Sequence, residues 1–166
     1  MPSTGSEVPS VLSVKSKKPP RFGMGRVYLD ATVEALRRGD RRVGTEHLVL
    51  ALLQNPDSIT AKALQVELAS ARAALQSLDL VALRSVGIDA VVDSQVFPGK
   101  QGDRLRLTPA AREVFTGLRK EAGADRLGVQ HVLLALLSHQ PPDPAADLLD
   151  ALGVDRVTVR ARLGRT

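Results

Sequence analysis

Two histidines stand at the same place in a ten-residue pattern that occurs twice. Residues 44–53 read GTEHLVLALL and residues 128–137 read GVQHVLLALL, which puts His47 and His131 at the fourth position of each copy. Imidazole is a common metal ligand, but no cysteine or carboxylate recurs beside both rings. We therefore expect each histidine to pack or cap at the start of a helix, and we expect no metal site.

Enzymatic chemistry is not indicated elsewhere in the chain. The acidic residues are scattered, and no Ser/His/Asp or paired-carboxylate motif can be recognised. A loop of the type Gly-x-x-x-x-Gly-Lys-Ser/Thr is missing, because the run Phe97-Pro98-Gly99-Lys100 lacks both the leading glycine and the hydroxyl residue. Without these phosphate and magnesium ligands we expect no ATP hydrolysis, no cofactor and no enzyme activity. The absence of cysteine excludes disulfides and thiolate metal sites.

The residues around the two histidines predict helices. Of the 166 residues, 43% are hydrophobic but only 2% are aromatic, so leucine, valine and alanine must fill the core. Leucine and alanine favour helix, and the composition therefore predicts an all-α fold. Thr45 and the pair Thr108-Pro109 are typical helix starts, with threonine as the N-cap. Further helices are expected from about Arg26 to Arg38, from Ser58, along the face of Ala71, Leu75, Leu78 and Ala82, from Ile88, from Asp143 and from Asp155.

The net charge of +5 is concentrated near the N-terminus. Residues 1–26 hold one acid, Glu7, against the cations Lys15, Lys17, Lys18, Arg21 and Arg26, so the rest of the chain is close to neutral. We divide the chain into a flexible basic tail (1–25), a first repeat (26–96), a polar linker (97–107) and a second repeat (108–166), with one compact domain over 26–166. No apolar run is long enough to span a membrane and no signal-peptide pattern is present, so we expect a soluble, cytoplasmic protein without membrane contact.

A second internal match suggests where the two repeats differ. Residues 85–89 (SVGID) parallel residues 151–155 (ALGVD), but these segments are less far apart than the two histidine patterns. The first repeat should therefore contain about 18 additional residues, or five helical turns, near residues 65–84. We expect an extra or extended helix there.

The duplicated Gly-Thr-Glu-His pattern, with Thr108-Pro109-Ala110-Ala111-Arg112 opening the second half, resembles the N-terminal repeat domain of the Clp family of AAA+ unfoldases, most closely the ClpC type. The resemblance covers roughly residues 22–164. It implies an all-α, pseudo-twofold bundle of two four-helix repeats, present here without the AAA+ ATPase modules. In the family this domain docks substrates and adaptor proteins, so the resemblance implies a protein-binding module that acts as an adaptor, a decoy or a ligand sequestrant in Clp proteolysis.

The resemblance also implies binding residues and ligands. Glu46, beside Thr45, matches a position that binds phosphoarginine in some ClpC-type members, whereas the second copy has the uncharged Gln130. Leu107, Thr108 and Met24 stand where the family usually has Phe-Thr, on a surface that some cyclic peptide antibiotics occupy. The implied partners are a Clp unfoldase or protease, its substrates, and cyclic peptides. The simpler alternative is that Glu46 only stabilises the positive end of its own helix.

One alternative function remains open. The basic tail could contact nucleic acid, which would make the chain a small nucleic-acid-associated helical protein. The near-neutral remainder and the scarcity of aromatic residues for base stacking disfavour nucleic acid as a partner.

Overall fold

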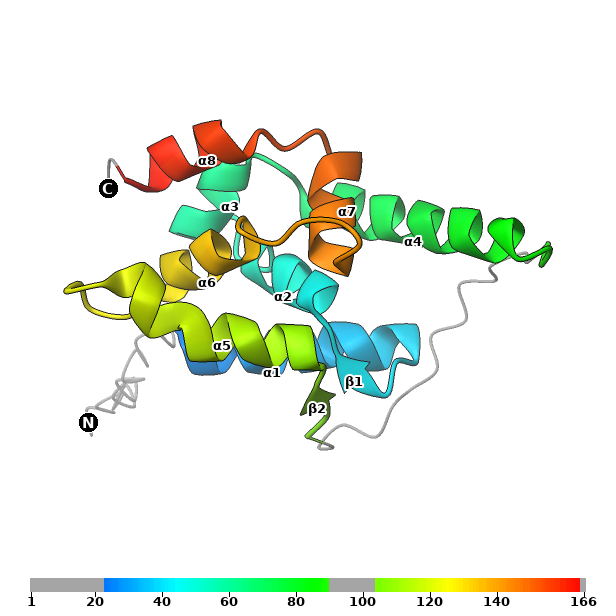
Figure 1. Ribbon diagram of the computed structural model, residues 1–166, viewed down its shortest axis with the longest axis horizontal. Helices are drawn as coiled ribbons and strands as arrows, with labels where there is room; N and C mark the ends of the chain where they lie inside the picture. Colours follow the sequence, from blue (N-terminus) through cyan, green and yellow to red (C-terminus); the bar gives the residue numbers. More distant parts are fainter. Residues whose placement is uncertain (1–22, 90–103, 165–166) are drawn as a thin grey trace, which may run out of the picture.

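The computed structural model describes residues 23–89 and 104–164. This part of the chain forms eight helices and one two-stranded ribbon, which confirms the predicted all-α fold (Figure 1). In chain order the elements are α1 (Met24–Arg38), β1 (Arg42–Val43), α2 (Thr45–Leu52), α3 (Ile59–Leu64), α4 (Leu68–Ser85), β2 (Arg106–Leu107), α5 (Pro109–Ala122), α6 (Val129–Leu136), α7 (Pro144–Ala151) and α8 (Arg156–Leu163). Helices α1–α4 and α5–α8 form the two repeats of the pseudo-twofold bundle.

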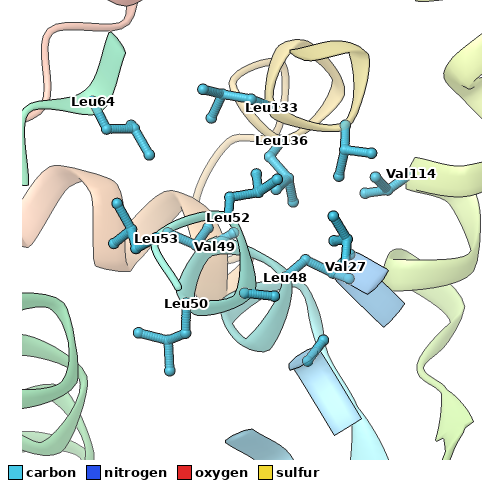
Figure 2. Close-up of a cluster of buried hydrophobic side chains, with 14 of the residues drawn as sticks. Val27, Leu48, Val49, Leu50, Leu52, Leu53, Leu64, Val114, Leu133 and Leu136 are labelled. Atoms are coloured by element: carbon cyan, nitrogen blue, oxygen red, sulfur yellow. The ribbon is translucent and has the colours of Figure 1, made fainter. Parts of the chain in front are cut away.

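The two copies of the repeated pattern form the centre of the bundle. Helices α2 and α6 are apolar on nearly all sides and therefore need partners all round. Helix α2 contacts α1, α4, α5, α6 and α7, so it touches both repeats. Figure 2 shows Leu48 and Leu52 of α2 in one cluster with Leu133 and Leu136 of α6, and all four side chains are fully buried. The two repeats thus share a single hydrophobic core.

The difference between the repeats lies in their last helices. Helix α4 has 18 residues and α8 has 8, so the extended helix expected in the first repeat is present as a longer α4, but α4 is only ten residues longer than α8, not the predicted 18 or so. Both helices follow a residue in the left-handed conformation, Gln65 (φ 55°) and Gly153 (φ 66°), and begin three residues later. The match of Gly87 with Gly153 was therefore wrong, because Gly87 follows α4 whereas Gly153 precedes α8. A glycine suits a left-handed corner at either place, so the short motif could not distinguish them.

Helix α4 is held against α1 by two ion pairs. Arg72 donates to the buried carboxylate of Glu34, with Nε 3.1 Å from Oε2, and Arg38 Nη2 lies 2.8 Å from Asp79 Oδ2. The C-terminal part of α4 projects from the bundle (Figure 1), and Val81 there is 62% exposed. Along the apolar face predicted for this helix, Ala71 and Leu75 are buried, Leu78 is half-buried and Ala82 is exposed.

Several predictions about chain organisation fall partly or wholly outside the described residues. The basic tail over 1–25, most of the linker over 97–107 and most of the short helix from Ile88 are among them. The last two residues of that linker form a strand, β2, which pairs in parallel with β1. In this pairing Arg106 lies beside Arg42 and Leu107 beside Val43. None of the described helices is long and apolar enough to cross a membrane.

Candidate functional site

Both histidines of the repeated pattern cap their own helix. The Gly44 N–H donates to His47 Nδ1 at 2.9 Å, and the Gly128 N–H donates to His131 Nδ1 at 3.0 Å. Both rings are buried, so the predicted packing and capping role is confirmed. The prediction that Thr45 is the N-cap is wrong, because Gly44 occupies that position and Thr45 is the first helical residue.

The glycine before each helix leaves room for a folded-back side chain. An ideal Cβ placed on Gly44 would lie 2.3 Å from Glu46 Oε2, and one on Gly128 would lie 2.3 Å from Gln130 Oε1. Glu46 and Gln130 therefore fold over the N-cap residue of their own helix. This close approach, rather than any unusual backbone angle, explains a glycine at the start of both copies.

The carboxylate of Glu46 is largely covered and poorly hydrogen-bonded. Its side chain is 15% exposed, and Oε2 is buried without a hydrogen-bond partner. Oε1 lies 3.3 Å from His47 Nδ1, but that nitrogen already accepts the Gly44 N–H and has no proton to give. A buried carboxylate oxygen without a donor is costly, so this oxygen is a place where a cationic or amide-bearing group would be stabilised.

Asp40 completes the surroundings of His47. Because Nδ1 is an acceptor, the proton of the neutral ring is on Nε2 and is donated to Asp40 Oδ2 at 2.9 Å. Arg38 Nε donates to the same oxygen at 3.0 Å. The hydrogen bond from His47, together with the Arg38 guanidinium, holds the pKa of Asp40 below its ordinary value.

The group Asp40, Glu46 and His47 could also be interpreted as a metal centre, because one ligand atom from each lies within 4.8 Å of the others. Both ring nitrogens of His47 already have hydrogen-bond partners, one of them the N-cap amide. A metal ion would have to displace one of these bonds. We therefore assign His47 to helix capping, with Asp40 as the partner of its second ring nitrogen.

Thr45 and Val129, which follow the two glycines, differ in role. Thr45 Oγ1 donates to Asp143 Oδ1 at 2.9 Å and accepts the Ala145 N–H at 3.3 Å, at the first turn of α7. Thr45 is buried and ties the first repeat to the second through these two hydrogen bonds. Val129 is buried without such a bond, because it has no side-chain donor or acceptor.

The predicted residues Met24 and Leu107 line one groove between α1 and α5. The groove has a volume of about 430 Å³ and mostly apolar walls. It is lined by Met24, Gly25, Tyr28, Leu107, Phe115, Thr116, Leu118, Arg119 and Leu127. Thr108 is not part of the wall and instead caps α5, where its Oγ1 accepts the Ala111 N–H at 3.2 Å. Glu46 and Gln130 are not in the wall either, so the structure separates the predicted residues into one groove and the starts of three helices, α2, α5 and α6.

The groove also contains aromatic residues that the sequence analysis missed. The chain has one tyrosine and three phenylalanines, and Tyr28 and Phe115 both line this groove. The Tyr28 hydroxyl donates to the Leu105 carbonyl at 2.7 Å, which ties α1 to the chain just before β2. Their rarity was the available signal, because scarce aromatic residues in a Leu/Ala-rich chain mark places where large rigid surfaces are used.

Comparison with known proteins agrees with this architecture. The family model described as the Clp repeat (R) N-terminal domain matches residues 25–152. The chain is 33% identical over 133 residues to the negative regulator of genetic competence ClpC/MecB of Bacillus subtilis, which is 78% of this chain and 15% of that protein. It is 34% identical over 125 residues to the chaperone protein ClpB of Oceanobacillus iheyensis (73% and 14%), and 29% identical over 143 residues to the chloroplastic chaperone protein ClpC of Pisum sativum (84% and 14%).

The chain thus spans about one-seventh of the length of these relatives and corresponds to their N-terminal repeat region. The eight-helix bundle, the duplicated histidine caps and the family match over most of the described residues agree with one another. The chain belongs to the Clp repeat N-terminal domain family.

Proposed function

We propose that the α1–α5 groove docks an apolar segment of a protein or peptide handled by a Clp unfoldase or protease, and that the chain acts as an adaptor, decoy or ligand sequestrant. The observation that supports this proposal is the meeting of Met24 and Leu107 in one groove, because each stands at the start of one repeat. A groove built from both repeats exists only in the folded bundle. Its apolar walls favour aliphatic and aromatic side chains and cyclic peptides.

The wall of the groove also carries a positive charge. Among the described residues that line the groove, Arg119 is the one cation, and it can pair with a carboxylate of the docked segment. Tyr28 and Phe115 offer rigid faces whose ordering costs little entropy on binding. An apolar segment with an adjacent acid is therefore the preferred ligand.

The test compares two matched substitutions in fluorescence-anisotropy titrations with labelled apolar peptides, linear and cyclic. Met24→Glu puts a charge into the groove, whereas Val157→Glu puts the same charge on α8 at a side chain that is 76% exposed and outside the groove. We expect Met24→Glu to abolish binding and Val157→Glu to leave it unchanged, with both variants retaining the wild-type helical signal. Equal affinity of the two variants would contradict the proposed groove.

A second ligand is supported by the unpaired Oε2 of Glu46. A guanidinium or phosphoarginine group could donate to this oxygen, and hydrogen bonds between charged groups are roughly twice as strong as neutral ones. Gln130 offers no charge, so we expect such a ligand to prefer the first repeat. In calorimetric titrations with a phosphoarginine peptide, Glu46→Gln should weaken binding and Gln130→Ala should change it little. Equal losses, or no binding by the wild type, would leave Glu46 with a structural role only.

A further inference from the structure

The ribbon formed by β1 and β2 displays four arginines on the surface. Arg41 and Arg42 belong to the arm that contains β1, and Arg104 and Arg106 to the arm that contains β2. All four side chains are exposed. Within residues 23–89 and 104–164, none of the four has an ion pair with a carboxylate. We refer to these four residues as the arginine surface.

The strand pairing places like charges side by side. Arg42 and Arg106 are direct partners in the parallel register, and neighbouring strands lie about 4.8 Å apart. Both residues are exposed, whereas their neighbours Val43 and Leu107 are buried or half-buried, so the two arginines lie on the same outer side of the ribbon. Like charges that face each other across a ladder are destabilising. An anionic ligand would remove this repulsion and contact both guanidinium groups.

Two acids near the arginine surface in the described part of the chain, Asp40 and Asp79, are already engaged by other residues. Asp40 directly precedes Arg41, but its Oδ2 already accepts hydrogen bonds from Arg38 and His47. The more distant Asp79 is engaged by Arg38. No carboxylate within residues 23–89 and 104–164 therefore pairs with these four arginines, even though the chain beyond its N-terminal tail is nearly neutral overall.

The composition of this surface favours a peptide over a nucleic acid. Arginine forms two parallel hydrogen bonds with a planar carboxylate, and all four cations here are arginines. Binding of a single strand of nucleic acid commonly requires aromatic side chains on which bases stack. The large exposed hydrophobic residues of the described chain are Leu, Val and Ile, and none is aromatic.

We infer that the arginine surface binds an acidic, Asp/Glu-rich segment of a partner protein. This surface is separate from the proposed groove, because Arg106 faces outward while its neighbour Leu107 lines the groove. The inference therefore does not depend on the groove having a ligand. Because the contacts are charged and exposed, the affinity should fall as ionic strength rises.

The experiment measures fluorescence anisotropy of a labelled peptide of alternating Asp and Glu with the full chain. An Asn/Gln peptide, single-stranded oligo-dT and a short DNA duplex serve as the other probes. The test variant is Arg42→Gln/Arg106→Gln, and the matched control is Lys62→Gln/Arg84→Gln, which removes the same charge from exposed residues of α3 and α4. Both variants keep the basic N-terminal tail, so any contribution of the tail is the same in each.

We expect the acidic peptide to bind and the Asn/Gln peptide not to bind. Arg42→Gln/Arg106→Gln should lower the affinity for the acidic peptide about tenfold, because two charge-assisted contacts are lost. The affinity of the control variant should stay within about twofold of the wild-type value. Met24→Glu in the groove should leave this binding unchanged, which separates the two surfaces. Equal binding by the two double variants, tighter binding of either DNA probe, or no binding of the acidic peptide would overturn the inference.

Discussion

Replacing His47 by alanine should destabilise the fold more than the same change at His131. Each substitution removes a buried ring and leaves the N–H of Gly44 or Gly128 without its acceptor. His47→Ala additionally removes the donor to Asp40 Oδ2, a hydrogen bond of 2.9 Å. The two variants therefore differ by one identifiable interaction at otherwise equivalent positions of the repeat.

The magnitudes follow from these contacts. Loss of the cap together with an unsatisfied buried N–H costs about 1–3 kcal/mol, and the smaller side chain adds a cavity, so His131→Ala should lose about 2–4 kcal/mol. The additional bond at His47 joins a charged acceptor, but the Asp40 side chain is 40% exposed and water can partly replace the lost donor. We therefore expect His47→Ala to lose about 1 kcal/mol more than His131→Ala.

Urea unfolding followed by circular dichroism measures both free energies. A double-mutant cycle of His47→Ala and Asp40→Ala isolates the bond between the two side chains, because cap and cavity effects cancel in the cycle. The expected coupling is about 1 kcal/mol. Equal losses for the two histidine variants together with a coupling near zero would refute the assigned role of the His47–Asp40 bond, and a loss well below about 1 kcal/mol for both would refute the capping role itself.

Three further predictions concern pH, the attachment of α4, and activity. Because the hydrogen bond from His47 and the Arg38 guanidinium lower the pKa of Asp40 in the folded state, its stabilising contribution is complete above its ordinary pKa of about 3.8 and is lost as pH falls through the lower folded value. The unfolding free energy of Asp40→Asn should thus differ from that of the wild type at pH 7 and approach it in acid; a constant difference at all pH values would contradict this. Arg72→Ala leaves the buried carboxylate of Glu34 without its cation and should cost about 2 kcal/mol or more in urea unfolding, whereas the exposed Arg84→Ala on the same helix should stay within about 0.5 kcal/mol. The purified chain should release no phosphate from ATP in a coupled assay, because it has no phosphate-binding loop, and turnover that survives repeated purification would disprove this.

Local sequence patterns were sufficient for the helices and for the role of the histidines. The apolar residues of 44–53 and 128–137 recur on nearly all sides of a helix, and such segments are stable only at the centre of a bundle. The start of α5 at Thr108-Pro109 and the start of α7 at Asp143 were also predictable, because capping depends on residues within one turn.

Contacts between residues that are distant in the sequence could not be predicted from these local patterns. The sequence places Thr45 next to a helix start, but only the packing of α2 against α7 directs its hydroxyl to Asp143 instead of its own helix. The position of Gly87 was misjudged for a similar reason, since a glycine corner looks the same before and after a helix.

The groove and the arginine surface are the clearest products of tertiary structure. Met24 and Leu107 are far apart in the chain. They line a common groove only because the fold brings the start of α1 close to β2 and α5. Arg42 and Arg106 become neighbours only through the parallel pairing of β1 and β2. Side-chain periodicity is a property of a few consecutive residues and is therefore encoded locally, whereas a shared surface depends on how elements from both repeats meet over a common core.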